Sequence, residues 1–157
     1  METTAARYLE YMIHGFYNYI VTLMELEGIS DEEMETVYAL GYNFFTYGKY
    51  EDARDIFIGL TAYAPYTAHY WRALGATNQQ LKDYSEAIAA YDMAIANDEL
   101  DVVSYVYRGE SQILSGNVEA AIKDFEEVPK IGAKYPDPQF EPWVQRSELL
   151  LRVHKQS

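Results

Sequence analysis

The sequence predicts an all-α fold, an array of three helix-turn-helix repeats with one further helix at each end. The main observation is that one span of the chain recurs three times at a spacing of 34 residues, without an insertion or deletion. The residues that stand in register are Gly41, Gly75 and Gly109; Ala53, Ala87 and Ala121; and Phe57, Tyr91 and Phe125. A second observation is that 49% of the 157 residues are hydrophobic and none is cysteine. This composition predicts one domain with a packed core, without disulfides or thiolate metal sites.

A 34-residue period of this kind is typical of tetratricopeptide repeats. The small residues let the two helices of a repeat approach to about 8–10 Å, and the large ones fill the space between helices. One helix pair cannot bury its apolar face alone, so the repeats must stack. We expect a single domain over 1–157, with repeats at 34–67, 68–101 and 102–135.

The segment before the repeats predicts a helix over residues 5–27 that is apolar nearly all round. Its apolar residues are Leu9, Met12, Ile13, Phe16, Ile20, Leu23 and Met24. A helix of this kind is buried on more than one side. One side can pack on the array and another on a second subunit, with a plain capping helix as the alternative. The dimerisation prediction rests on Leu9, Met12, Ile13, Phe16 and Ile20.

Capping residues, glycines and a proline in the sequence predict where the helices begin and end. Ser30 and Glu33 form a capping box ahead of the first helix of repeat one. Asp83 and Asn117 stand where the second helices of repeats two and three should begin. The turns within the repeats hold Gly48 in repeat one and Gly116 in repeat three, and Pro65 stops the second helix of repeat one.

The third repeat departs most from the pattern, because Arg108 stands where the others have Leu40 and Leu74. After it, the Pro136-Asp137-Pro138 break predicts a loop over residues 130–139. A C-terminal capping helix follows over 140–155. Its apolar residues are Trp143, Leu149, Leu150 and Val153.

The expected binding surface lies on the first helices of the repeats, which line the concave wall of such an array. At helical spacing, its stripe falls three residues before each repeat glycine, and one and four residues after it. The predicted groove residues are Tyr38, Tyr42 and Phe45 from repeat one, His69, Arg72, Ala76 and Gln79 from repeat two, and Val106 from repeat three. The three aromatic residues of repeat one form an apolar stripe that implies a partner. The alternative is that the N-terminal helix folds over this stripe and buries it.

Several function classes are disfavoured. A net charge of −13 repels nucleic-acid backbones and anionic membrane surfaces. The apolar-rich stretch 11–26 is too short to span a bilayer. The three histidines, His14, His69 and His154, lie far apart, and no nucleophile elbow, phosphate loop or metal-ligand spacing accompanies them. We therefore expect no enzyme activity, no cofactor and no metal.

Beyond the generic repeat, residues 34–125 resemble the class II (translocator) chaperones of bacterial type III secretion. The resemblance rests on the segments 37–45, 48–53, 70–75 and 84–88. It implies a bacterial cytoplasmic chaperone that binds an N-terminal segment of hydrophobic translocator proteins in its groove and keeps them soluble and export-competent. It also implies a homodimer formed through the N-terminal region and, for some members, assistance to a transcriptional activator.

The resemblance carries over to particular residues. The groove aromatics of that family match Tyr38, Tyr42 and Phe45, and the second-repeat wall matches Arg72, Ala76 and Gln79. The glycine-rich N-terminal stretch of the family is reduced here to Gly15 alone. The alternative function is a general scaffold or adaptor in another protein assembly. The clamp by which eukaryotic co-chaperones of this fold hold an acidic C-terminus is absent, because Tyr38, Tyr42 and Ala76 occupy the corresponding face.

Overall fold

The computed structural model describes residue 25 and residues 27–155. The predicted helix over 5–27 therefore lies almost wholly outside the described residues, as do its dimerisation residues Leu9, Met12, Ile13, Phe16 and Ile20. The described helices are α3 (Asp31–Thr46), α4 (Tyr50–Tyr63), α5 (Ala68–Gln80), α6 (Tyr84–Asn97), α7 (Val102–Leu114), α8 (Val118–Lys134) and α9 (Glu141–Lys155).

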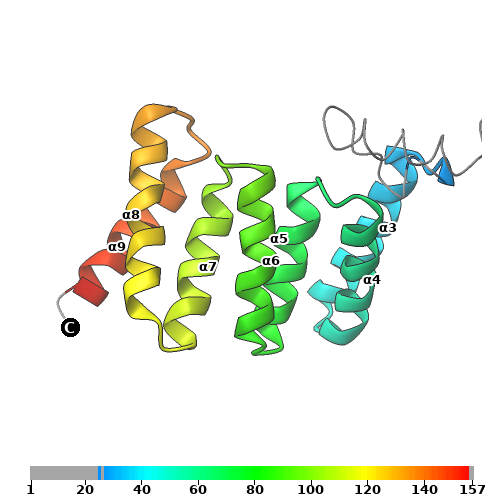
Figure 1. Cartoon of the computed structure of the whole chain (residues 1–157), viewed down its shortest axis with the longest axis horizontal. Coiled ribbons are helices and arrows are strands. Elements are labelled where there is room, and N and C mark those ends of the chain that lie inside the picture. The colour runs from blue at the N-terminus through cyan, green and yellow to red at the C-terminus, as the bar shows by residue number, and fades with distance from the viewer. Residues whose placement is uncertain (1–24, 26, 156–157) are drawn as a thin grey trace, which may run out of the picture.

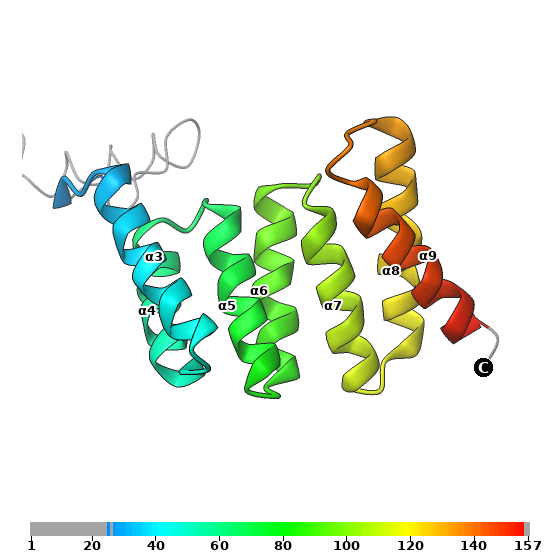
Figure 2. The same ribbon diagram turned by 180° about the vertical axis from the view of Figure 1, so that it is seen from behind.

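These helices form the predicted all-α repeat array. The pairs α3/α4, α5/α6 and α7/α8 are three helical hairpins, and they stack side by side in chain order (Figure 1). The first helices α3, α5 and α7 form one layer together with α9, and α4, α6 and α8 form the layer behind it (Figure 2). Within the described part of the chain, each helix is too short or too polar to cross a membrane.

The repeat glycines lie where the two helices of a hairpin touch. A Cβ atom on Gly41 would stand 2.8 Å from Cε1 of Phe57, and one on Gly75 would stand 2.7 Å from Cε1 of Tyr91. Both rings are buried. The small residues predicted from the period are thus required by close packing, since any side chain there would displace a core ring.

The helix ends agree with the sequence signals, with one exception. The Glu33 amide donates to Ser30 Oγ at 3.2 Å, and the Ser30 amide donates to Glu33 Oε2 at 2.9 Å, which completes the capping box. Asn117 Oδ1 accepts from the Ala120 amide at 3.3 Å. Asp83 stands at the start of α6, but its side chain accepts no hydrogen bond from a backbone amide of the helix and accepts one from the Ser85 hydroxyl instead.

Repeat three replaces an apolar contact with a partly buried ion pair. Arg108 Nε donates to Asp124 Oδ2 of α8 at 2.8 Å, and Arg108 Nη1 donates to Asp92 Oδ1 of α6 at 2.6 Å. Burial raises the pKa of the Asp124 carboxyl, against the opposing effect of the Arg108 hydrogen bonds. Arg108 therefore joins three helices at the position where Leu74 packs in repeat two.

The prediction of a loop over 130–139 is wrong, because α8 continues to Lys134. Pro129 lies inside the helix and removes one backbone donor. Val128 and Ile131 on either side of it are buried, and their packing holds the helix together across the proline. The loop is limited to residues 135–140.

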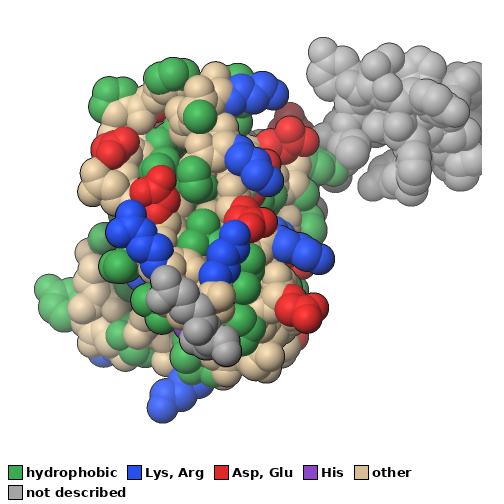
Figure 3. Space-filling view, turned by 90° about the vertical axis from the view of Figure 1, so that its left-hand side faces the viewer, with side chains coloured by type: hydrophobic (Ala, Val, Ile, Leu, Met, Phe, Trp, Pro, Cys, Tyr) green, Lys and Arg blue, Asp and Glu red, His purple; other side chains and the backbone are tan. Residues whose placement is uncertain are grey.

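Helix α9 stands where the first helix of a fourth repeat would lie, in contact with both α7 and α8. Its Trp143, Val144 and Leu150 pack onto the core cluster of α7 and α8. Two other residues used to predict this helix, Leu149 and Val153, are exposed and do not contribute to the core. Figure 3 shows this end of the molecule, where charged side chains lie among hydrophobic ones.

Candidate functional site

A groove crosses the first helices of the array and holds a cavity of about 160 Å³. It is lined by Tyr38, Tyr42 and Phe45 of α3, Phe57 of α4, Arg72, Ala73 and Ala76 of α5, and Val103 and Tyr107 of α7. We call this surface the concave groove. It brings together five of the predicted site residues, from two repeats.

The aromatic stripe of α3 forms one wall of the concave groove. Tyr38 and Tyr42 stack with ring centroids 6.4 Å apart, and Tyr42 and Phe45 follow at 6.5 Å. Spacings of four and three residues put these rings on one helix face. Tyr42 is 53% exposed, while Tyr38 and Phe45 are half-buried. Among the described residues, the stripe is thus open to solvent at its centre and anchored at both ends.

Tyr38 is the anchored end of this wall. Its ring lies 5.8 Å from that of Phe57 and 5.6 Å from that of Tyr70. Burial raises the pKa of the Tyr38 phenol, although the positive charge of Arg72 opposes the shift. Tyr38 therefore stays neutral near pH 7, and its hydroxyl can donate a hydrogen bond to an occupant of the groove.

Arg72 is the cationic residue among those that line the cavity. Its Nη1 donates to Asp101 Oδ1 at 2.7 Å. Asp101 is buried, and it also accepts from the amide and hydroxyl of Ser104 at the start of α7. A buried carboxylate that is held in this way fixes the guanidinium at the junction of α5 and α7.

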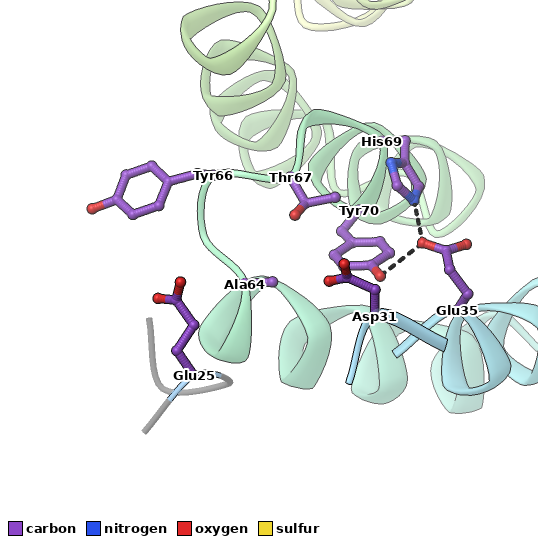
Figure 4. A pocket seen from close by; sticks show the side chains of 8 residues that line it. All are labelled: Glu25, Asp31, Glu35, Ala64, Tyr66, Thr67, His69 and Tyr70. Carbon is purple, nitrogen blue, oxygen red and sulfur yellow. Dashed lines mark hydrogen bonds and ion pairs between the residues drawn. The ribbon is translucent and has the colours of Figure 1, made fainter. Parts of the chain in front are cut away.

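His69 lies at the edge of the concave groove, in a neighbouring acidic pocket. Its ring packs edge-on against Tyr38 at 5.1 Å between centroids. Its Nε2 is 3.0 Å from Glu35 Oε1, the same oxygen that accepts from the Tyr70 hydroxyl at 2.9 Å (Figure 4). The pocket has a volume of about 310 Å³. His69 is thus engaged by Glu35 and does not line the cavity of the concave groove.

Two other predicted groove residues lie elsewhere. Gln79 does not line the cavity, and its Oε1 accepts a hydrogen bond from the buried Tyr91 hydroxyl at 2.9 Å. The assignment of Val106 to the groove is wrong, because its side chain is fully buried in the core cluster. Trp143, Val144 and Leu150 of α9 pack against the cluster that contains Val106.

Sequence reasoning missed Val103 and Tyr107, which form the α7 side of the cavity. They stand six and two residues before Gly109, on the side of α7 that faces α5. Ala73 has the same place as Tyr107 in repeat two and also lines the cavity. A stripe that included the position two residues before each repeat glycine would have found Ala73 and Tyr107, and Val103 holds the repeat position that His69 holds in repeat two.

At the α7 end of the groove, Tyr107 belongs to a stack of side chains from α7 and α9. Arg146 Cζ lies 5.2 Å from the ring centroid of Tyr107 and 5.8 Å from that of Trp143. Arg146 Nε also donates to Glu110 Oε1 at 2.8 Å. Arg146 thus links Tyr107, which lines the cavity, to α9.

The chemistry of the concave groove is that of a binding surface. Aromatic rings and small side chains line it, and its charged member is already paired with a buried carboxylate. Within the described residues, no group of three or more histidine, aspartate or glutamate side chains could hold a metal ion. The arrangement favours burial of apolar side chains from an extended or helical chain segment.

Comparison with known sequences agrees with this architecture. The profile of the tetratricopeptide-repeat family matches residues 38–102 and 83–136. The chain is 31% identical over 97 residues to low calcium response locus protein H of Yersinia pestis, which covers 62% of this chain and 58% of that protein. It is 29% identical over 105 residues to chaperone protein SicA of Salmonella typhimurium, covering 67% and 64% respectively. The match therefore spans less than two thirds of these curated relatives.

Solved structures are similar over a larger share of the chain. A chain of a T3SS complex from Aeromonas hydrophila has a TM-score of 0.85 and 27% identity, covering 92% of this chain and 95% of that one. The type III secretion translocator chaperone SycD of Yersinia enterocolitica has a TM-score of 0.79 and 25% identity, covering 84% and 97%. PcrH in complex with the chaperone binding region of PopD has a TM-score of 0.78 and 28% identity, covering 82% and 96%.

Proposed function

Because the chain belongs to the tetratricopeptide-repeat family, we propose that its concave groove binds an extended apolar segment of a client protein. The client is a hydrophobic translocator of a bacterial type III secretion system, bound in the cytoplasm before export. The observation that carries this proposal is the stripe of Tyr38, Tyr42 and Phe45, which opens into a cavity shared by three successive first helices.

The similar structures support this choice of client. PcrH is seen with the chaperone binding regions of PopD and PopB, and SycD with a peptide of the translocator YopD. An apolar anchor buried in such a groove contributes about 1.5–3 kcal/mol. Two or three anchors contribute about 3–9 kcal/mol before the entropy lost on association, and micromolar affinity corresponds to about 8 kcal/mol, so contacts besides these anchors must add to the binding.

A chaperone role follows from the same physics. Apolar client segments that lie in the groove are withheld from aggregation, and the net charge of −13 keeps the complex soluble. The groove does this by binding alone, so the proposed role includes no catalytic step and no cofactor.

We also propose that the chain forms a homodimer through the apolar residues near its N-terminus, Leu9, Met12, Ile13, Phe16 and Ile20. Light scattering of the full chain tests this. Replacing Phe16 and Ile20 by aspartate should convert a dimer into a monomer, and a monomer for the unmodified chain would contradict the proposal.

The binding proposal is tested by co-expressing the chain with a candidate translocator and measuring the soluble fraction of the translocator. The test variant carries Tyr42→Ala and Phe45→Ala, which remove the open part of the stripe. The matched control is Tyr47→Ala, because Tyr47 is 82% exposed at the end of the same helix and does not line the cavity.

We expect the double variant to lose most of the soluble client and the control to keep it. Titration with a peptide from the N-terminal segment of the client should show an affinity at least tenfold lower for the double variant, about 1.4 kcal/mol. An unchanged affinity, with the helical circular dichroism intact, would mean that the client binds elsewhere.

A further inference from the structure

The junction between α6 and α7 differs from the junction between α4 and α5, although the repeat period makes the two equivalent. At the α4/α5 junction, Leu74 of α5 packs in one core cluster with Phe57 and Leu60 of α4. Arg108 holds the place of Leu74 at the α6/α7 junction, and its Nη1 donates to Asp92 Oδ1 of α6 at 2.6 Å. A polar contact thus joins repeats two and three where apolar packing joins repeats one and two.

Two apolar core clusters lie on either side of the α6/α7 junction. The first runs from Met34 of α3 to Ala90 of α6. The second contains Val106 of α7 and Val128 of α8, and α9 packs against it. The two clusters share no residue. The described array therefore consists of two units with separate cores, which we call the first unit (residues 31–97) and the second unit (residues 102–155).

Arg108 is bound more firmly to the second unit than to the first. Its Nε and Nη2 donate to the two carboxylate oxygens of Asp124 in α8, whose side chain is 8% exposed. The side chain of Asp92, its partner in the first unit, is 55% exposed. Because water competes for an exposed carboxylate, an ion pair of this kind contributes little to holding two helices together. Motion at the junction would keep the pair with Asp124 and give up only the pair with Asp92.

The aromatic contact across the junction allows the two units to slide. Tyr91 of α6 and Tyr107 of α7 lie with ring centroids 6.2 Å apart and ring planes inclined by 19°. Nearly parallel rings can move along each other and remain in contact, and small sliding of packed helices is a known form of domain motion. Tyr107 is held to the second unit by Trp143 of α9, whose ring centroid lies 5.5 Å from its own.

One end of the junction is fixed, and the other is not held in the same way. The connection over residues 98–101 joins α6 to α7 at the end of the hairpins drawn uppermost in Figure 1. Asp101 in this connection is buried and accepts from Arg72 Nη1 of α5 at 2.7 Å. Rotation about this point would move the opposite ends of α5 and α7, at Gln80 and Leu114, the furthest.

We propose that the array is hinged at the α6/α7 junction, so that the two units rotate relative to each other and change the width of the concave groove. The groove lies across the hinge, because α3, α4 and α5 line one side of its cavity and Val103 and Tyr107 of α7 line the other. Val103 packs against the core of the second unit and moves with it. The hinge lets one groove hold client side chains of different size, a consequence that rests on the proposed function of the groove.

Pulsed electron paramagnetic resonance of paired spin labels tests the hinge in the full chain, which has no cysteine of its own. The test pair is Gln80→Cys with Glu119→Cys, at the end of α5 and the start of α8, and it spans the α6/α7 junction. The matched control is Thr46→Cys with Ser85→Cys. These residues hold the same repeat positions one period earlier and span the α4/α5 junction. All four side chains are exposed.

We expect the distribution of label distances for the test pair to be at least about twice as broad as that for the control pair, because only the test pair spans the hinge. Equal widths for the two pairs would overturn the proposal. The measurement is made on the free chain and needs no client, so its result does not depend on whether the groove binds a translocator.

A second measurement asks whether the polar contacts cause the motion. Arg108→Leu and Asp124→Ala are added together to the test pair, which gives repeat three the Leu74 and Ala90 of repeat two. We expect the distance distribution of the test pair to narrow toward that of the control pair, because apolar packing then joins both junctions in the same way. A distribution that stays as broad as before would refute the assignment of the hinge to these contacts.

Discussion

Gly75 of α5 lies so close to Tyr91 of α6 that a Cβ atom at position 75 would stand 2.7 Å from Cε1 of the ring. Tyr91 is fully buried, and its hydroxyl is held by Gln79 Oε1, so the ring cannot move aside freely. We expect Gly75→Ala to lower the free energy of unfolding by about 1–2 kcal/mol, because overpacking outweighs the gain in helix propensity. Urea denaturation measures this.

The background variant Tyr91→Leu supplies the control, since a flexible leucine can give way to the added methyl group. Gly75→Ala should cost less in that background. An equal loss in both would show that the ring is not the obstacle.

Val106 and Tyr107 are sequence neighbours with different roles. Val106→Ala creates a cavity in the core and should lower the free energy of unfolding by about 1–3 kcal/mol, without changing client affinity. Tyr107→Ala removes part of the concave groove and should weaken binding of a client peptide about tenfold. Calorimetric titration below the unfolding transition separates the two effects. If Val106→Ala weakened client binding and Tyr107→Ala did not, Val106 would belong to the binding surface.

Arg108 and Asp124 can be exchanged for the apolar pair of repeat two. Arg108→Leu alone leaves Asp124 buried without its partner and should cost about 3–5 kcal/mol of unfolding free energy. Adding Asp124→Ala reproduces the Leu74 and Ala90 of repeat two, and we expect stability to return to at least the original value. Denaturant unfolding of both variants decides this, and a double variant as unstable as the single one would contradict it.

The single variant Arg108→Leu also has a predicted pH dependence. Burial raises the pKa of Asp124 above its ordinary 3.8, so the folded state holds a proton that the unfolded state releases. Loss of Arg108 removes the hydrogen bonds that oppose this rise, so the stability deficit of the variant relative to the unmodified chain should be smallest below pH 3.8 and should grow as pH rises through the folded-state pKa. A difference that does not change with pH would exclude Asp124 as its source.

The capping box of α3 has the opposite dependence. Hydrogen bonds from the Ser30 amide and hydroxyl lower the pKa of Glu33 below its ordinary 4.5. The stabilisation is fully present above pH 4.5 and is lost as pH falls through the lowered pKa. NMR titration of the Glu33 carboxyl should show the lowered pKa in the unmodified chain and a smaller lowering in Ser30→Ala, which removes the hydroxyl but keeps the amide of residue 30. An ordinary pKa of 4.5 in the unmodified chain would contradict the capping box.

The 34-residue period predicted the helix pairs because it reflects side-chain contacts between the two helices of each repeat. Gly41, Gly75 and Gly109 lie against their rings as small residues must, and the positive φ values of Gly48 and Gly116 form the predicted turns. These features depend on contacts within one repeat, which recur at every copy of the period.

The sequence predictions were wrong where the position of a residue depends on contacts that the repeat period does not encode. Val106 is buried in a cluster against which Trp143 and Val144 of α9 pack, and nothing within repeat three indicates that neighbour. The loop expected over residues 130–139 was assigned from prolines, but burial of Val128 and Ile131 carries α8 past Pro129. Tyr107 was missed because the stripe was drawn on only one side of each first helix.

Contacts in the described array join each helix only to the next helix or the next but one. A growing polypeptide can therefore complete each hairpin soon after it leaves the ribosome, without waiting for distant residues. α3 and α4 would already be packed while α9 is still being translated.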